Sequence, residues 1–374
     1  MVDGSSRTAP NIGWPRPTAI CVSMMAFLLM LPSLSSLSTS PVLTTAATPA
    51  IRILPPHTWH AEARLHREAV GSILQLVGHS DPNALKLNLT DPISNFICDY
   101  YRVKPRRLLA WSPGPLVGLS QPFESESTRS LVLRGNSRHG VARDLLFATG
   151  ASDVHDVGMF DPKHIPLATL DAFFLDRSIL VATELRVPIF SCFGLHEWAI
   201  LYHPPGTPEP VRHQERDNPD LHLRVSQETI NGVVEGKIPI SKDTLPLRCT
   251  HFDAIRFFHP EARPHNTVVP EPNRSTQVLN EQPGCVHSHM DLLFYALRLG
   301  PFIPSDLFRD CLQCAMDSRA VDVRATPYAV DDPICVETVA GRKEYARAQE
   351  GLFEKAKPVR RRLIEAYAPI LGGR

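Results

Sequence analysis

Apolar residues recur at helical spacing in several stretches of the chain. Leu65, Ala69, Val70, Ile73, Leu74 and Val77 recur at helical spacing and predict a helix near the start of the main domain. Ser226, a residue type favoured at the first position of a helix, precedes another such pattern. The same spacing predicts further helices over residues 167–185, 290–299, 304–316 and 341–367, the last interrupted at Pro358.

Two other stretches have patterns typical of strands. Residues 187–203 form a mostly buried strand or strand pair in this interpretation. Residues 249–258 alternate with a period of two, which places Cys249, His251 and Asp253 on one face. The chain also has 35 prolines, which favour many short connections. We therefore expect an α+β fold: a single loop-rich globular domain with a mixed or antiparallel sheet flanked by helices.

The first 50 residues have the pattern of a targeting leader. No acidic residue occurs between Gly4 and His60, and residues 19–31 are almost entirely apolar. Such a run is too short to span a bilayer and matches the apolar part of a signal peptide. We expect residues 1–50 to be a signal or bipartite transit peptide on an organelle or secretory route. A plastid is the favoured destination, with secretion and mitochondrial import as alternatives. Residues 51–374 then form a single catalytic domain without an integral membrane span.

Charge and cysteine content limit the partners and the cysteine chemistry that we expect for this chain. Basic and acidic residues number 39 each, so the formal charge is zero. Proteins that bind duplex nucleic acid usually carry a basic surplus, so nucleic acid is a possible partner that the charge does not favour. Of the 8 cysteines, Cys21 lies in the leader, which leaves an odd number for the domain. This count favours free or metal-bound thiols over a disulfide framework.

Three short segments pair a cysteine with a histidine two or four residues away. Such spacing lets one turn or one strand face direct both side chains to the same point. The six candidate metal ligands are Cys192, His196, Cys249, His251, Cys285 and His287. A site with three or four nitrogen and sulfur ligands suits Zn²⁺, and Fe²⁺ is the alternative if histidine and carboxylate ligands dominate.

Nearby charged residues are candidates for catalysis. Glu197 follows a candidate ligand directly, and a carboxylate close to a metal but not bound to it can transfer protons to and from metal-bound water. Asp253 and Asp291 are further candidates for proton transfer, and Arg256 for contact with an anionic group. The leading hypothesis is a metal-dependent enzyme that acts on a small organic substrate; the sequence leaves its oligomeric state undetermined.

The same residues allow two other interpretations. Cys285 precedes an expected helix start, where the helix dipole would lower its pKa and make it a nucleophile, with His287 or His251 as the base. Buried cysteines also act as small apolar side chains, so the cluster is equally compatible with core packing in a ligand-binding or structural protein without catalysis.

Four multi-residue motifs are similar to those of one protein family. They are C-F-G-L-H-E-W-A at Cys192–Ala199, R-C-T-H-F-D-A-I-R-F-F at Arg248–Phe258, P-E-A-R-P-H-N at Pro260–Asn266 and P-G-C-V-H-S-H-M-D-L at Pro283–Leu292. In these the chain resembles actinobacterial-type proteins commonly labelled 3-methyladenine DNA glycosylase. The resemblance covers the chain from about Pro92 onward, and Ser112 stands where the family has a histidine.

The resemblance implies hydrolysis of the N-glycosidic bond of an alkylated base. In that alternative, Asp253 or Asp291 would orient the attacking water and Arg256 would lie near a phosphate.

Overall fold

The computed structural model describes residues 52–78, 88–89, 91–120, 131–132, 157–160, 162–210, 221–241 and 245–372. The chain divides into two units, Met1–Pro49 and Ala50–Arg374, and all described residues belong to the second. The expected leader over residues 1–50 therefore lies outside the described residues and stays a prediction. Within the described part, every helix is too short or too polar to serve as a membrane span.

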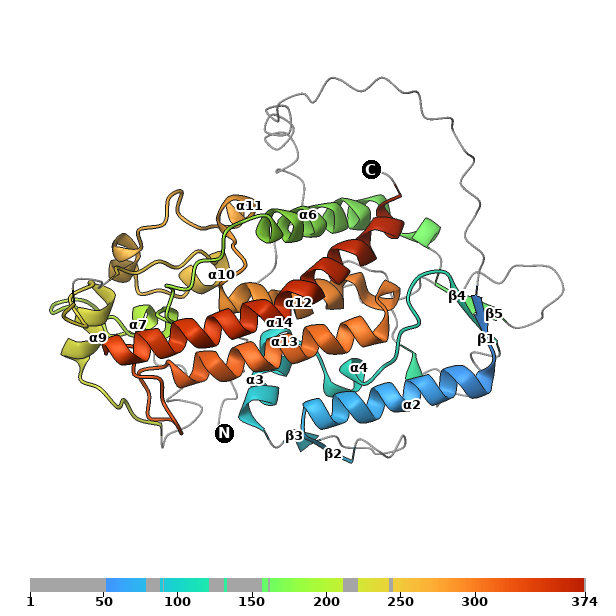
Figure 1. Ribbon diagram of the computed structural model, residues 1–374, viewed down its shortest axis with the longest axis horizontal. Coiled ribbons are helices and arrows are strands. Elements are labelled where there is room, and N and C mark those ends of the chain that lie inside the picture. The colour runs from blue at the N-terminus through green and yellow to red at the C-terminus, as the bar shows by residue number, and fades with distance from the viewer. Residues whose placement is uncertain are drawn as a thin grey trace, which may run out of the picture. The chain divides into compact units, whose positions relative to one another are not determined.

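Long helices form the main body of the described unit. They are α2 (Pro56–Ile73), α6 (Leu167–Glu184), α12 (Val286–Leu299), α13 (Ser305–Arg324) and α14 (Val339–Leu371). Helix α12 packs against α13 and α14, while α14 also contacts α6 and α13 also contacts α2 (Figure 1). The sequence pattern predicted all five, because each buries one apolar stripe.

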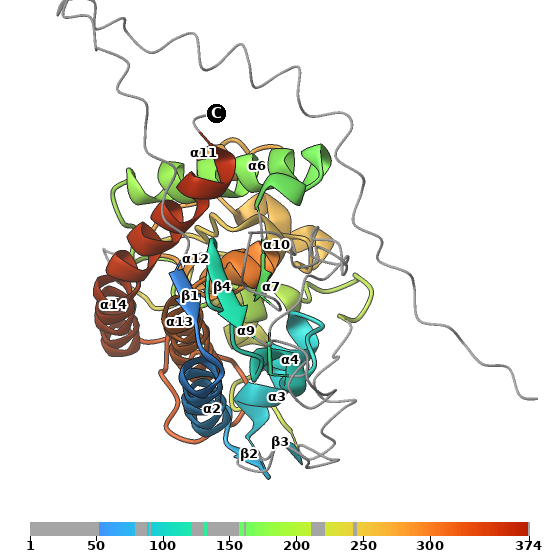
Figure 2. The ribbon, with the colours of Figure 1, turned by 90° about the vertical axis from the view of Figure 1, so that its right-hand side faces the viewer.

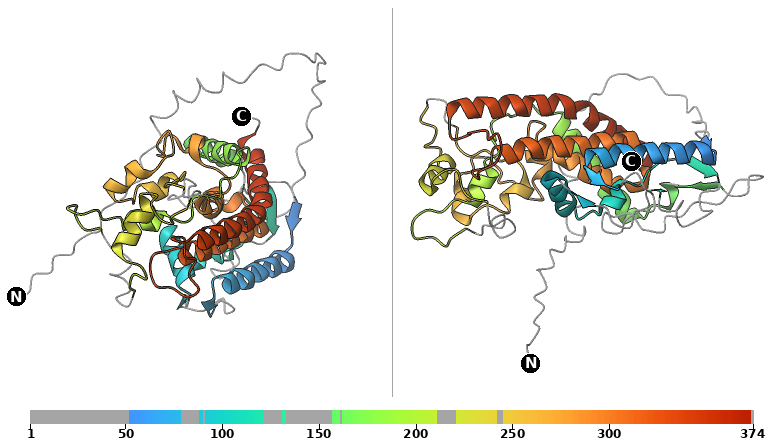
Figure 3. Two further views of the ribbon diagram at one scale, coloured as in Figure 1. Left: turned by 60° about the vertical axis from the view of Figure 1, so that its left-hand side comes forward. Right: turned by 90° about the horizontal axis from the view of Figure 1, so that it is seen from below.

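Short helices occupy the connections. They are α3 (Pro92–Tyr100), α4 (Pro105–Leu108), α7 (His196–Ile200), α9 (Gln227–Val234), α10 (Phe252–Ile255) and α11 (Gln277–Asn280), with 3₁₀ turns η2 (Pro162–His164), η3 (Pro260–His265) and η4 (Gly300–Phe302). Helices α7, α9 and α10 gather at one end of the long helices, and the strands β1, β4 and β5 lie at the other (Figures 1 and 3).

The main sheet is small and mixed. Strand β1 (Arg52–Leu54) runs parallel to β4 (Val117–Ser120), as Figure 2 shows, and β4 pairs antiparallel with β5 (Val157–Met159). A separate two-stranded ladder joins β2 (Leu76–Val77) to β3 (Asn88–Leu89). The expected α+β class with a mixed sheet beside helices is therefore confirmed.

Helix boundaries follow local capping. The Ser226 hydroxyl accepts the N–H of Thr229 and begins α9, as predicted. Helix α14 begins in the same way at Thr338, whose hydroxyl accepts the N–H of Gly341 at 3.0 Å. The expected interruption at Pro358 is wrong, because α14 continues through it. The helix buries apolar side chains on both sides of this proline, and we infer that this packing outweighs the lost backbone hydrogen bond.

The two expected strand segments are wrong. Residues 187–195 are irregular and lead into α7, and residues 249–251 lead into α10. Amide side chains bind the backbone there in the way that a neighbouring strand would. Gln282 Oε1 accepts the N–H of Ile189 at 2.8 Å, and its Nε2 donates to the Ile189 carbonyl at 3.2 Å. Asn266 likewise binds both the N–H and the carbonyl of Cys249.

Buried apolar side chains form two clusters. The first core lies among α2, α3, α6, α12, α13 and the C-terminal half of α14, and includes Phe173, Phe308 and Leu363. The second core surrounds Trp198 where α7, α9 and α10 meet the N-terminal half of α14. The three segments that carry the candidate ligands run beside this second core.

Candidate metal centre

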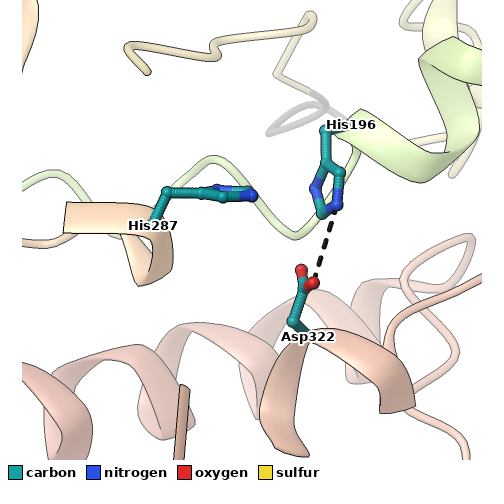
Figure 4. A group of neighbouring side chains, drawn as sticks. All are labelled: His196, His287 and Asp322. Atoms are coloured by element: carbon teal, nitrogen blue, oxygen red, sulfur yellow. Dashed lines mark ion pairs between the residues drawn. The ribbon is translucent and has the colours of Figure 1, made fainter. Parts of the chain in front are cut away.

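Three residues from distant segments bring ligand atoms together. His196 lies at the start of α7, His287 in the first turn of α12, and Asp322 near the end of α13. One ligand atom from each lies within 4.8 Å of the other two. In Figure 4 the imidazole of His287 and the carboxylate of Asp322 both point toward His196, whose Nε2 is 3.6 Å from Asp322 Oδ2. Two imidazoles and one carboxylate form a donor set that suits Zn²⁺ or Fe²⁺.

A buried ion-pair network surrounds this group. Arg319 donates to the carboxylate of Asp322 one turn along α13, and its Nη1 is 3.7 Å from Glu197 Oε1. Glu197 Oε1 is in turn 3.7 Å from His196 Nε2. The Arg319 guanidinium also lies over the ring of Phe96 at 3.8 Å from its centroid. The carboxylate of Glu197 therefore lies beside the candidate ligands, close to but outside the group of three.

A second group of possible ligands lies next to the first. One ligand atom from each of His251, Glu281 and Asp291 falls within 4.8 Å of the other two. His251 Nε2 is 3.0 Å from Asp291 Oδ2. The rings of His251 and His287 stack with their centroids 5.1 Å apart and an angle of 22° between planes, while those of His196 and His287 are 4.6 Å apart. The three predicted histidines therefore line one continuous buried cluster.

Asp253 and Arg256 lie at the edge of this cluster. Asp253 is in the first turn of α10, and its Oδ2 accepts the hydroxyl of Tyr100 at 2.6 Å. Arg256 Nε forms an ion pair with Asp253 Oδ1 at 2.9 Å, and 40% of the Arg256 side chain is exposed. The guanidinium is therefore the most accessible charge of the predicted set.

Neighbouring charges and burial shift the pKa values of the three histidines in different directions. Burial lowers the pKa of His251, but the Asp291 carboxylate more than offsets this and raises it to about 9. The pKa of His196 is also raised, because Asp322 and Glu197 outweigh the effect of burial. Burial, together with the charges of His196 and His251, holds the pKa of His287 well below its usual value. His287 is therefore a neutral imidazole near neutral pH, the form that binds a metal.

The three predicted thiols lie beside the histidines without joining either ligand group. Cys285 Sγ is 4.0 Å from His287 Nδ1, and Cys249 Sγ is 3.7 Å from the carbonyl oxygen of His251. Gln349 Nε2 donates to Cys192 Sγ at 2.9 Å. All seven cysteines in the described residues are free, which agrees with the expectation of free or metal-bound thiols.

The expected lowering of the Cys285 pKa is wrong in direction. Cys285 does lie at the N-cap of α12, but its hydrogen bond to Cys192 and its burial raise its pKa well above the usual value. The same hydrogen bond, with a smaller contribution from Gln349, lowers the pKa of Cys192 to about 7. The more acidic thiol is therefore Cys192, which the sequence did not favour as a nucleophile.

Two carboxylates in the ligand groups were not predicted. Asp322 lies in the last turns of α13, where nothing in the local sequence distinguishes it from the other charged residues of that helix. Glu281 directly precedes the Q-P-G-C segment, and that proximity to a predicted motif is the one signal that could have indicated it. Burial, which raises the pKa of Glu281, sets it apart only once the fold is known.

Ser112 has a structural role at the position where the resembled family has histidine. Its hydroxyl donates to the carbonyl of Pro301 at 2.6 Å, and its N–H donates to Ser305 Oγ at 2.6 Å. Ser305 Oγ also donates to the Ser112 carbonyl at 2.9 Å. These bonds join the loop after α4 to the start of α13.

Comparison with models of known protein families, with curated proteins and with solved structures found no match. The resemblance to the glycosylase family therefore stays a prediction from the four motifs.

Proposed function

We propose that this chain is a metal-dependent enzyme that acts on a small organic substrate, with one metal ion held by His196, His287 and Asp322. The convergence of these three side chains carries the proposal, because they come from separate segments yet have ligand atoms within 4.8 Å of one another. Ligands about 2.0–2.2 Å from a shared ion lie roughly 3–4.4 Å apart, so small side-chain movements would close the group around an ion.

The donor set supports a catalytic ion over a purely structural one. Structural zinc sites use four protein ligands, commonly cysteines, whereas three protein ligands leave a position for water or substrate. Zn²⁺ and Fe²⁺ both fit two imidazoles and a carboxylate. Such an ion, when bound, polarises a substrate oxygen or lowers the pKa of a bound water.

Glu197 is the group that we assign to proton transfer. Its carboxylate lies 3.7 Å from His196 Nε2 and 3.7 Å from Arg319 Nη1, beside the metal ligands. Asp253 is already bound by Tyr100, and Asp291 by His251. We therefore assign Asp253 and Asp291 to positioning these partners and not to proton transfer. The partly exposed Arg256 is suited to contact an anionic part of the substrate.

The charges of α14 support a small substrate over duplex DNA. Arg361 pairs with Glu184, Arg362 pairs with Asp306 and Asp310, and Lys355 pairs with Asp317. Acidic partners thus neutralise part of the basic surface that would be needed to bind phosphates.

Metal analysis of the purified full-length chain tests the proposal. We expect at least one Zn²⁺ or Fe²⁺ per chain, and we expect His196→Gln, His287→Gln and Asp322→Asn each to remove one equivalent. The matched control is His57→Gln, because His57 is exposed on α2 and far from the cluster in the sequence; it should leave the metal content unchanged. A wild-type chain that stays metal-free after loading with either ion would refute the proposal.

The glycosylase alternative has its own assay. Release of free alkylated base from methylated DNA by the wild-type protein, but not by Asp253→Asn, would favour that alternative over a small substrate. We expect no release.

A further inference from the structure

The second ligand group holds more negative than positive charge. Glu281 is 2% exposed, Asp291 is 8% exposed, and His251 is 1% exposed. Among the residues that the structure describes, the one ion pair that these two carboxylates form is that of Asp291 with His251. Glu281 instead accepts a hydrogen bond from Gln277 Nε2 at 2.6 Å. Glu281 has the charges of His251 and Arg360 nearby but forms an ion pair with neither, so a cation bound within the group would stabilise both buried carboxylates.

The ligand atoms of this group are also arranged for one ion. His251, Glu281 and Asp291 come from the loop before α10, the residue after α11 and the second turn of α12. One atom of each lies within 4.8 Å of the others, the same criterion that the first group meets. Two ligand groups of the same size therefore lie in one buried cluster.

An unpaired imidazole nitrogen gives independent support. His251 Nδ1 is buried and has no hydrogen-bond partner among the described residues. Buried polar atoms without a partner are rare in folded proteins and are found where a ligand or water completes the site. His251 therefore has one ring nitrogen directed at Asp291 and a second buried nitrogen that is still able to bind a ligand.

The two ligand groups are neighbours. His251 of the second group stacks on His287 of the first, with ring centroids 5.1 Å apart. The ring centroids of His287 and His196 are in turn 4.6 Å apart, with the rings nearly perpendicular, and Figure 4 shows both rings above Asp322. Ions bound at both groups would therefore lie within the same buried cluster of histidines.

We propose that His251, Glu281 and Asp291 bind a second divalent first-row cation, so that the enzyme has a two-metal centre. The inference rests on the proposed function, because the second ion would assist the first. One imidazole and two carboxylates are harder ligands than the His196, His287 and Asp322 set, so the second site selects Fe²⁺ or Mn²⁺ over softer ions. Its ion would bind the substrate through a carbonyl, carboxylate or phosphate oxygen.

Metal stoichiometry tests this proposal with Fe²⁺ as the probe. The full-length chain is loaded with Fe²⁺ under anaerobic conditions, free ion is removed, and iron per chain is measured. We expect two ions for the wild type, one for Glu281→Gln, and one for Asp322→Asn. The matched control is Glu350→Gln, an exposed carboxylate on α14, which should keep two ions.

The outcomes separate the two proposals. One ion in the wild type, lost in Asp322→Asn and kept in Glu281→Gln, would overturn the second site and leave the first intact. No iron in the wild type would overturn the second site, and a wild-type chain that binds neither Fe²⁺ nor Zn²⁺ would overturn both. If Glu281→Gln does not fold, Asp291→Asn takes its place, and a wild-type chain with a single ion still decides against the second site.

Discussion

The two cores hold the same chain together in different ways. In the first core, the long helices α12, α13 and α14 bury apolar stripes against one another, with Phe308 and Leu363 almost fully covered. Beside the second core, His196, His251 and His287 lie at the beginnings of α7, α10 and α12. The irregular segments before α7 and α10 are fixed by amide side chains, and His196 and His251 lie beside carboxylates. Apolar packing therefore holds together the long helices of the first core, which we call the frame. Polar contacts instead set the positions of the candidate ligands.

The largest expected effect is on the apolar frame. Phe308→Ala removes a side chain that is 1% exposed in the first core. We expect a loss of about 3–5 kcal/mol in the free energy of unfolding, because a cavity remains where the ring was. Urea unfolding measures it. Metal content per folded chain should stay the same; a parallel loss of metal from the folded variant would show that the two regions are not separable in this way.

Acid should destabilise the frame through a buried histidine. Burial lowers the pKa of His66 to about 4, and its Nε2 donates to the Leu108 carbonyl at 3.1 Å. The unfolded chain takes up a proton below about pH 6.5, but the folded chain does so only near pH 4. Stability is therefore lost as pH falls through this window, by about 3 kcal/mol.

Unfolding free energies at pH 7 and pH 5 measure the His66 effect. His66→Gln retains a donor for the Leu108 carbonyl and removes the titrating group, so its stability should change less between these values. Equal pH dependence of the variant and the wild type would contradict the assignment.

A smaller effect should appear where the two regions meet. Tyr100 on α3 belongs to the frame, and its hydroxyl donates to Asp253 at 2.6 Å. Tyr100→Phe leaves a buried carboxylate with one hydrogen-bond donor fewer, so we expect the free energy of unfolding to fall by about 1.5–3 kcal/mol. Tyr101→Phe is the matched control, because its hydroxyl donates to the neutral carbonyl of Met290 at 2.7 Å. Denaturant unfolding should show the smaller loss, about 1 kcal/mol, for the control. An equal loss in both would argue against a charged acceptor at Asp253.

The sequence predicted the frame better than the site. The long helices were found because apolar residues at a spacing of three and four produce a stripe that must be buried. The segments around Cys192 and Cys249 were taken for strands, because neither a short apolar run nor a period of two distinguishes a strand from an extended loop bound by Gln282 or Asn266. Gln282 is 93 residues away from Ile189 and Asn266 is 17 residues away from Cys249, so no local sequence pattern links each amide to the segment that it binds.

The residues of the candidate site were likewise predicted only in part. The histidines were predicted because they repeat beside cysteines, and the structure brings all three together. The thiols were expected to be ligands, yet neither ligand group includes one. Asp322 and Glu281 could not be predicted, because a carboxylate on a helix is ordinary until tertiary packing places it against an imidazole.

Helix α14 contributes buried side chains to both cores. Its 33 residues extend roughly 50 Å, and they include Tyr345 in the second core and Tyr367 in the first. Gln349, between them, binds Cys192 and the Gly284 carbonyl. Because one helix packs in both cores, we expect its backbone amides near Tyr345 and near Tyr367 to exchange with solvent at similar rates, as they would in a single foldon.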